Sequence, residues 1–90
     1  MSMLVKKIGI NDPLGLHLRV AAQLAKTASN YKCKITVKNH NGHANGKSIL
    51  NLLALSAIAG SELTIILEGV DASAAWNAID HLFHDTLGVA

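Results

Sequence analysis

Cys33-Lys34-Ile35-Thr36-Val37-Lys38 alternates apolar and polar side chains without a break. This alternation predicts a β-strand with one buried face. Asn41-Gly42 follows as a hairpin turn signal, so His43 to Asn45 should return as a short strand. The preceding segment, Val20 to Tyr31, carries its apolar side chains at helical spacing. A helix therefore leads directly into a hairpin.

Two more strands and two more helices complete the pattern. Leu4 to Ile10 is rich in β-branched residues, and residues 62–68 alternate, so both are expected to be strands. Ser48 should cap a helix through about Leu53, and Asp71 should cap a last helix. Helices with one apolar face must lie against a sheet with one apolar face. The predicted fold is α+β, a two-layer open-faced sandwich of order β-α-β-β-α-β-α. It has a four-stranded, mainly antiparallel sheet with three helices on one face.

Composition limits the protein class. Ninety residues without an internal repeat predict a single domain, 1–90, and the net charge of +2 is too small to indicate nucleic acid. Cys33 is the only cysteine, which leaves no disulfide framework or thiolate metal cluster and fits a cytoplasmic location. The most apolar stretch, Ile49 to Ala59, is far shorter than the roughly 20 residues of a membrane span.

Gly15-Leu16-His17-Leu18-Arg19 stands at the start of the first predicted helix. The first N–H groups of a helix lack internal partners, and the helix dipole adds positive charge there, so this is an anion site. A phosphoryl group would be bound by the backbone of Leu18 and Arg19 and by the Arg19 side chain. Neutral imidazole can attack phosphorus. These residues predict a protein that carries phosphate on His17.

The segment from Gly15 to Ala22 resembles the phosphohistidine motif of the HPr family. Members of this family are phosphocarriers of the bacterial phosphoenolpyruvate-dependent sugar phosphotransferase system. Gly46-Lys47-Ser48-Ile49-Leu50, with Gly60 beyond it, resembles the family's second signature, around a regulatory serine. The resemblance covers essentially the whole chain. It implies that His17 accepts a phosphoryl group at Nδ1 from Enzyme I and passes it to enzyme II A-components, while Arg19 pairs with the phosphoryl oxygens.

The resemblance also implies regulation and docking. Ser48 would be phosphorylated by an HPr kinase/phosphorylase in hosts that have one. We expect a monomeric carrier that is not itself an enzyme, needs no cofactor and does not insert into a membrane. The residues expected to dock partners are Leu16, Val20, Lys47, Ile49, Leu50 and Leu53.

Several positions depart from the family pattern. Val20 replaces the usual proline, Asn51 and Ser56 stand where glycines are common, and Ala59 stands where a lysine is common. These changes touch the expected docking surface. They suggest a divergent member or a paralogue, and the alternative function is that of a regulatory HPr-like paralogue without a role in sugar transport. Such a paralogue would act in a nitrogen-type phosphorelay or as a Ser-phosphorylated binding partner.

Three other functions fit less well. The Gly-Lys-Ser at 46–48 lacks the spacing of a P-loop, because only three residues separate Gly42 from Gly46. The pairs His40-x-x-His43 and His81-x-x-His84 have no evident third ligand, so no metal site is predicted. A nucleic-acid binder is disfavoured by the single arginine and by strands without stacking aromatics.

Overall fold

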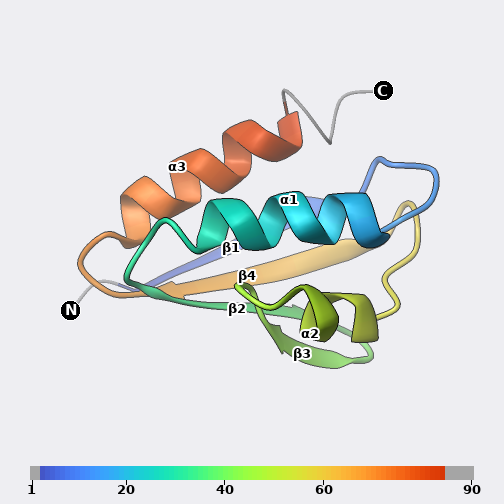
Figure 1. Ribbon diagram of the computed structural model, residues 1–90, viewed down its shortest axis with the longest axis horizontal. Helices are drawn as coiled ribbons and strands as arrows, with labels where there is room; N and C mark the ends of the chain where they lie inside the picture. The colour runs from blue at the N-terminus through green and yellow to red at the C-terminus, as the bar shows by residue number, and fades with distance from the viewer. Residues whose placement is uncertain (1–2, 85–90) are drawn as a thin grey trace.

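Four antiparallel strands form one open sheet, and three helices are interleaved with them in the predicted order (Figure 1). The computed structural model describes residues 3–84. The elements are β1 (Met3–Gly9), α1 (Leu18–Ala28), β2 (Lys34–Asn39), β3 (Gly42–Asn45), α2 (Ile49–Ala54), β4 (Glu62–Glu68) and α3 (Ala72–Leu82). The predicted fold class is confirmed, and each predicted strand overlaps an observed one.

The sheet has the strand order β1-β4-β2-β3, so the last strand in sequence lies between the first two. All three pairings are antiparallel. Leu67 of β4 pairs with Leu4 on one side and with Ile35 on the other, which places three apolar side chains on the same face. Helices α1 and α3 lie side by side over the sheet, and α2 packs beside α1 near β3 (Figure 1).

The core lies between this apolar face and the helices. Leu63, Ile65 and Leu67 of β4 are fully buried, while their neighbours Glu62 and Thr64 reach the other face. Burying each of these leucine or isoleucine side chains, rather than leaving it exposed, contributes roughly 1.5–3 kcal/mol to the free energy of unfolding. Helix α1 buries a stripe of mostly small residues on the face that it turns toward the core: Val20, Ala21, Leu24, Ala25 and Ala28. Within residues 3–84, no polar or charged residue is buried.

Two local details differ from the sequence prediction. Helix α1 ends at Ala28 rather than at Tyr31, because the chain tightens into turns in which the Tyr31 N–H donates to the Ala28 carbonyl. Asp71 does stand at the N-cap of α3, but its carboxylate does not cap that helix. It accepts hydrogen bonds from the N–H groups of Lys32, at 2.7 Å, and Cys33, at 2.9 Å. Asp71 thus ties the start of α3 to the start of β2.

Candidate functional site

His17 occupies the N-cap position of α1 in an extended backbone conformation. The first hydrogen bond of the helix runs from the Ala21 N–H to the His17 carbonyl, at 2.9 Å. The N–H groups of Leu18, Arg19 and Val20 precede this bond and have no acceptor within the helix. The His17 imidazole does not cap them. The structure therefore has the helix start that the sequence predicts, with His17 beside it.

Gly15 fixes the loop before His17 against the segment that follows α2. The Leu16 N–H donates to the Ala57 carbonyl at 2.9 Å. Gly15 has a φ of +70°, and a Cβ at this position would lie 2.4 Å from the Ala57 oxygen. Only glycine allows such an approach of two backbone segments. The two signature regions of the sequence, around His17 and around Ser48, are joined at this contact.

Asp12 lies between His17 and Arg19. Its Oδ2 accepts a hydrogen bond from Arg19 Nη2 at 2.6 Å, and its Oδ1 lies 3.3 Å from His17 Nε2. The second contact is within ion-pair distance but lacks hydrogen-bond geometry, so the buried Nε2 has no hydrogen-bond partner. The Asp12 side chain is only 11% exposed. The site is thus a cluster of one acid, one histidine and one arginine.

The pKa of Asp12 is lowered from its ordinary value. The largest cause is the hydrogen bond from the Leu14 N–H to Oδ1, at 3.0 Å, and the neighbouring His17 and Arg19 lower it further. Asp12 therefore carries a negative charge at neutral pH. In the sequence, this acid is recognisable only as part of a loop after the first strand, so its place in the site was not predicted. The available signal was weak: an acid five positions before the histidine in the same loop.

Ser48 is the N-cap of α2, as predicted. Its Oγ accepts a hydrogen bond from the Asn51 N–H at 3.2 Å. The adjacent Lys47 donates from Nζ to the Tyr31 carbonyl at 2.6 Å. Ser48 therefore begins α2 beside the segment that leaves α1, while the far end of α2 leads to the Gly15 contact.

The residues predicted to dock partners fall into two groups. Leu16 and Val20 are 4% and 1% exposed and belong to the core, so the structure removes their side chains from the expected docking surface. Their burial follows from the Leu16–Ala57 hydrogen bond and from the inward face of α1. Leu50 is 78% exposed, Ile49 is exposed to a lesser degree, and Lys47 and Leu53 are half-buried.

Three exposed apolar residues near His17 were not among the residues predicted to dock partners: Leu14, Leu18 and Ile58. Leu14 and Leu18 flank the Gly15-Leu16-His17 segment in sequence, and Ile58 follows the carbonyl that Leu16 contacts. Periodicity could not assign them, because they lie in loops or at the first residue of a helix. We call Leu14, Leu18, Leu50 and Ile58 the exposed apolar set.

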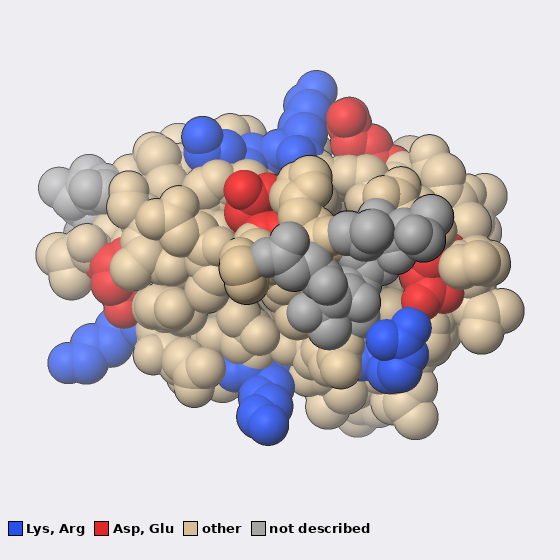
Figure 2. All heavy atoms as spheres, turned by 90° about the horizontal axis from the view of Figure 1, so that it is seen from above, with Lys and Arg blue, Asp and Glu red and all other residues tan. Residues whose placement is uncertain are grey.

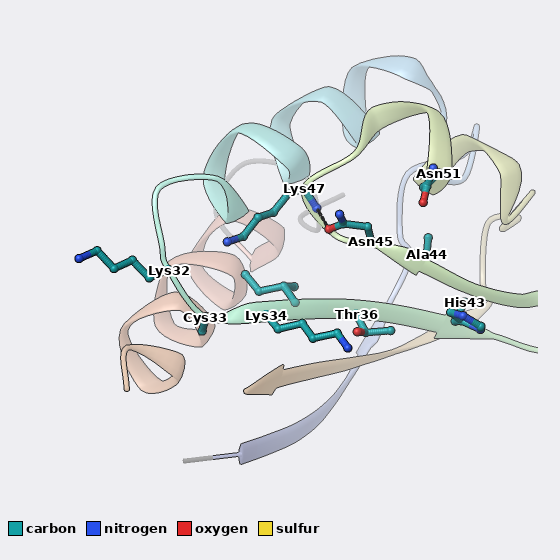
Figure 3. Close-up of a pocket in the computed structure, with 10 residues that line it drawn as sticks. Lys32, Cys33, Lys34, Thr36, His43, Ala44, Asn45, Lys47 and Asn51 are labelled. Atoms are coloured by element: carbon teal, nitrogen blue, oxygen red, sulfur yellow. Dashed lines mark hydrogen bonds between the residues drawn. The ribbon is translucent and has the colours of Figure 1, made fainter. Parts of the chain in front are cut away.

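A separate hollow of about 610 Å³ lies between β2, β3 and the start of α2 (Figure 3). Lys32, Lys34 and Lys47 line it together with His43, and neither His17 nor Arg19 contributes to it. On the face seen from above the helices, acidic and basic side chains are scattered rather than gathered into one patch (Figure 2). Because neither His17 nor Arg19 lines this hollow, the His17 cluster is a separate feature of the surface.

The histidine pairs noted in the sequence do not form a metal centre among residues 3–84. His84 Nε2 lies 3.1 Å from Asp80 Oδ1, one turn away on the same helical stretch. In that part of the chain, no group of three or more His, Cys, Asp or Glu side chains is arranged to hold a metal ion. Over the same described range, no helix is long and apolar enough to cross a membrane.

Comparison with known proteins gives a consistent result. Residues 4–85 match the family model described as PTS HPr component phosphorylation site. The phosphocarrier protein HPr of Treponema pallidum is 37% identical over 83 residues, covering 92% of this chain and 94% of the relative. The phosphocarrier protein NPr of Shewanella violacea is 38% identical over 79 residues, covering 88% of this chain and 87% of the relative.

Solved structures agree with these relatives. HPr-C-His from Thermoanaerobacter tengcongensis has a TM-score of 0.87 and 31% identity, covering 100% of this chain and 99% of that chain. A structure described as an HPr dimer from the same organism has a TM-score of 0.70 and 34% identity, covering 84% and 87%. The family model spans nearly the whole chain, and the solved HPr structures share its fold. The chain belongs to the HPr family, the phosphocarrier proteins of the phosphotransferase system.

Proposed function

We propose that His17 accepts a phosphoenolpyruvate-derived phosphoryl group from Enzyme I and passes it to enzyme II A-components during sugar uptake in the cytoplasm. The observation that carries this proposal is the position of His17 at the N-terminus of α1, next to three amides without helical acceptors and next to Arg19. An imidazole there can form a bond to phosphorus while fixed donors stabilise the oxygens. The protein turns over only with its partner phosphotransferases.

The chemistry is a transfer between two imidazoles. The Nδ1 lone pair of His17 attacks phosphorus, and the bond from phosphorus to the donor's histidine nitrogen breaks and returns its electron pair to that ring. Nε2 is the nitrogen shielded from solvent, so an incoming group reaches Nδ1 more readily. The amides at the start of α1 and the Arg19 guanidinium then bind the phosphoryl oxygens. The same step in reverse delivers the group to the acceptor.

Partners would contact the surface around His17. The exposed apolar set offers side chains that a partner can cover, and Lys47, Ile49 and Leu53 remain part of the proposed contact. Arg19 adds a positive charge beside them, which suits an acidic partner surface. We propose that the carrier is monomeric when it engages these partners. Sedimentation in the concentration range of the transfer assay measures this directly.

Ser48 is proposed as a regulatory phosphorylation site. A phosphate on its Oγ would lie at the N-terminus of α2, next to exposed Ile49 and Leu50. The fold should tolerate the phosphate, because free amides and the helix dipole favour an anion at that end. The added charge would instead repel an acidic partner.

The test is phosphorylation by Enzyme I and phosphoenolpyruvate, read as a mass increase by intact-mass spectrometry. The wild-type protein should gain one acid-labile phosphoryl group, and His17→Ala should gain none. Arg19→Ala should be phosphorylated more slowly while its melting temperature changes little, because an exposed arginine adds little to stability. A His17→Ala protein that still gains the labile group would contradict the assignment.

The choice of Enzyme I separates the two physiological roles. Sugar-type and nitrogen-type Enzyme I proteins should be compared at equal concentration. Faster transfer from the sugar-type donor supports the proposed function. Faster transfer from the nitrogen-type donor supports the regulatory alternative, for which the NPr relative from Shewanella violacea is the available observation.

A further inference from the structure

We propose that Asp12 is a positioning residue with two effects: it selects the ring nitrogen of His17 that is free to attack, and it holds Arg19 away from the phosphoryl position until the group arrives. The proposal rests on the phosphocarrier function above. Asp12 is the acid between the two functional side chains, at 3.3 Å from His17 Nε2 and 2.6 Å from Arg19 Nη2.

The Asp12 carboxylate is itself held in place. Its Oδ1 accepts the Leu14 N–H at 3.0 Å, and its backbone carbonyl accepts the Gly15 N–H at 2.9 Å. This is the local side-chain-to-backbone turn that aspartate forms readily in loops. The Gly15 segment is in turn fixed against Ala57. A carboxylate restrained in this way can orient its neighbours, since it cannot simply rotate into solvent.

The first effect concerns the tautomer of His17. A neutral imidazole carries one proton, on either Nδ1 or Nε2, and the other nitrogen keeps the lone pair. The carboxylate lies 3.3 Å from Nε2, which has no hydrogen-bond partner. A nearby negative charge favours the proton on Nε2, and this tautomer leaves the lone pair on Nδ1. Asp12 thereby orients the nucleophile before a donor arrives.

The second effect concerns Arg19. In the unphosphorylated protein its guanidinium is paired with Asp12 Oδ2, and its side chain is 53% exposed and free to move outward. A phosphoryl group on Nδ1 competes with Asp12 for the same guanidinium, because both are anions that accept its N–H groups. Placing the phosphoryl group therefore disrupts one ion pair and brings a second negative charge near Asp12. Both consequences destabilise the phosphorylated state and favour release of the group to an acceptor.

The test compares Asp12→Asn with the wild-type protein. Asparagine keeps an oxygen for the Leu14 N–H and removes only the charge. Asp12→Ser, which also keeps a short acceptor, serves as a second variant if the first is poorly folded. The matched control is Asp80→Asn, since Asp80 is also an acid beside a histidine, His84, and lies outside the site. A ¹⁵N–¹H correlation spectrum verifies the fold of each variant.

The first readout is the His17 tautomer, measured from the ring ¹⁵N shifts of the unphosphorylated protein at a pH where the ring is neutral. We expect the Nε2–H tautomer in the wild-type and Asp80→Asn proteins, and a clear loss of that preference in Asp12→Asn. An unchanged tautomer in Asp12→Asn would overturn the first effect. This measurement needs no phosphoryl donor, so its result does not depend on whether Enzyme I acts on the protein.

The second readout is the partition of the phosphoryl group between two carriers. Phosphorylated wild-type protein is mixed with an equal amount of variant and a trace of Enzyme I, and both masses are read at equilibrium. The group should favour Asp12→Asn by roughly two- to fivefold, the range of a partly exposed ion pair. Asp80→Asn should share it equally. Equal sharing with Asp12→Asn would overturn the second effect. If Enzyme I does not act, the two carriers are phosphorylated separately with phosphoramidate, which leaves as ammonia, and the phosphoryl group should then be lost to water faster from the wild-type protein than from Asp12→Asn.

Discussion

Replacing Gly15 by alanine should lower the free energy of unfolding by roughly 2–5 kcal/mol, the sum of two costs. The first is conformational: at a φ of +70° an L-residue loses roughly 1–2 kcal/mol relative to glycine. The second is steric. The new Cβ would lie 2.4 Å from the Ala57 oxygen and 2.9 Å from the Ile58 Cα, and both are backbone atoms. Overpacking of this kind costs about 1–3 kcal/mol.

Urea unfolding of Gly15→Ala and Gly60→Ala separates these two costs. Gly60 also has a positive φ, +82°, but a Cβ added there would meet no heavy atom within 4 Å, so Gly60→Ala should show the conformational cost alone. The two variants should differ by about 1–3 kcal/mol at equal m-values. Equal losses would refute the argument that the close approach of Gly15 to Ala57 holds the His17 loop in place.

Four further outcomes are expected. Ser56 has a φ of +51°, so Ser56→Gly relieves backbone strain but also makes the unfolded chain more flexible. The net effect should be a rise of about 0.5 kcal/mol in the unfolding free energy measured in urea. The pKa of Asp71 lies below its ordinary 3.8, chiefly because of the Lys32 N–H and then the Cys33 N–H. The Asp71 carboxylate therefore stabilises the fold above pH 3.8, and this contribution is lost as the pH falls through the lowered pKa. Asp71→Asn should consequently melt at a lower temperature than wild type at pH 7, and the difference in melting temperature should shrink as the pH is lowered to 2. Ser48→Asp should keep the fold but slow transfer from Enzyme I, most at low ionic strength; rates that coincide with wild type at low salt would leave Ser48 as a cap only. EDTA should leave the melting temperature unchanged, and a clear drop would indicate a metal that the histidine spacing does not predict.

The fold could be predicted from the sequence because its signals are local. The alternation in β2 and β4 and the helical spacing in α1 reflect which side chains face the core. The imperfect alternation of β1 also has a structural reason. Lys6 takes an inward position in the strand, and its Nζ lies 5.9 Å from the centre of the Trp76 ring. A charged side chain is tolerated there because its stem packs while its amine contacts an aromatic face.

The candidate site was predictable only in part. His17 and Ser48 could be found because each begins a helix, and helix starts have a recognisable residue pattern. Asp12 could not be assigned, because its approach to Arg19 depends on the path of the loop through Gly15. The burial of Leu16 also depends on a contact between segments about 40 residues apart, which no local pattern encodes.

The central place of β4 in the sheet has a consequence for synthesis of the protein. Both β1 and β2 pair with β4, and they do not pair with each other. A nascent chain that stops short of residue 62 therefore has two strands without their shared neighbour and cannot close the apolar layer. Chains grow at roughly 5–20 residues per second on the ribosome. The sheet can consequently close only after β4 has been synthesised. Until then the apolar side chains of Ile8, Ile35 and Val37 are exposed to chaperones or to aggregation.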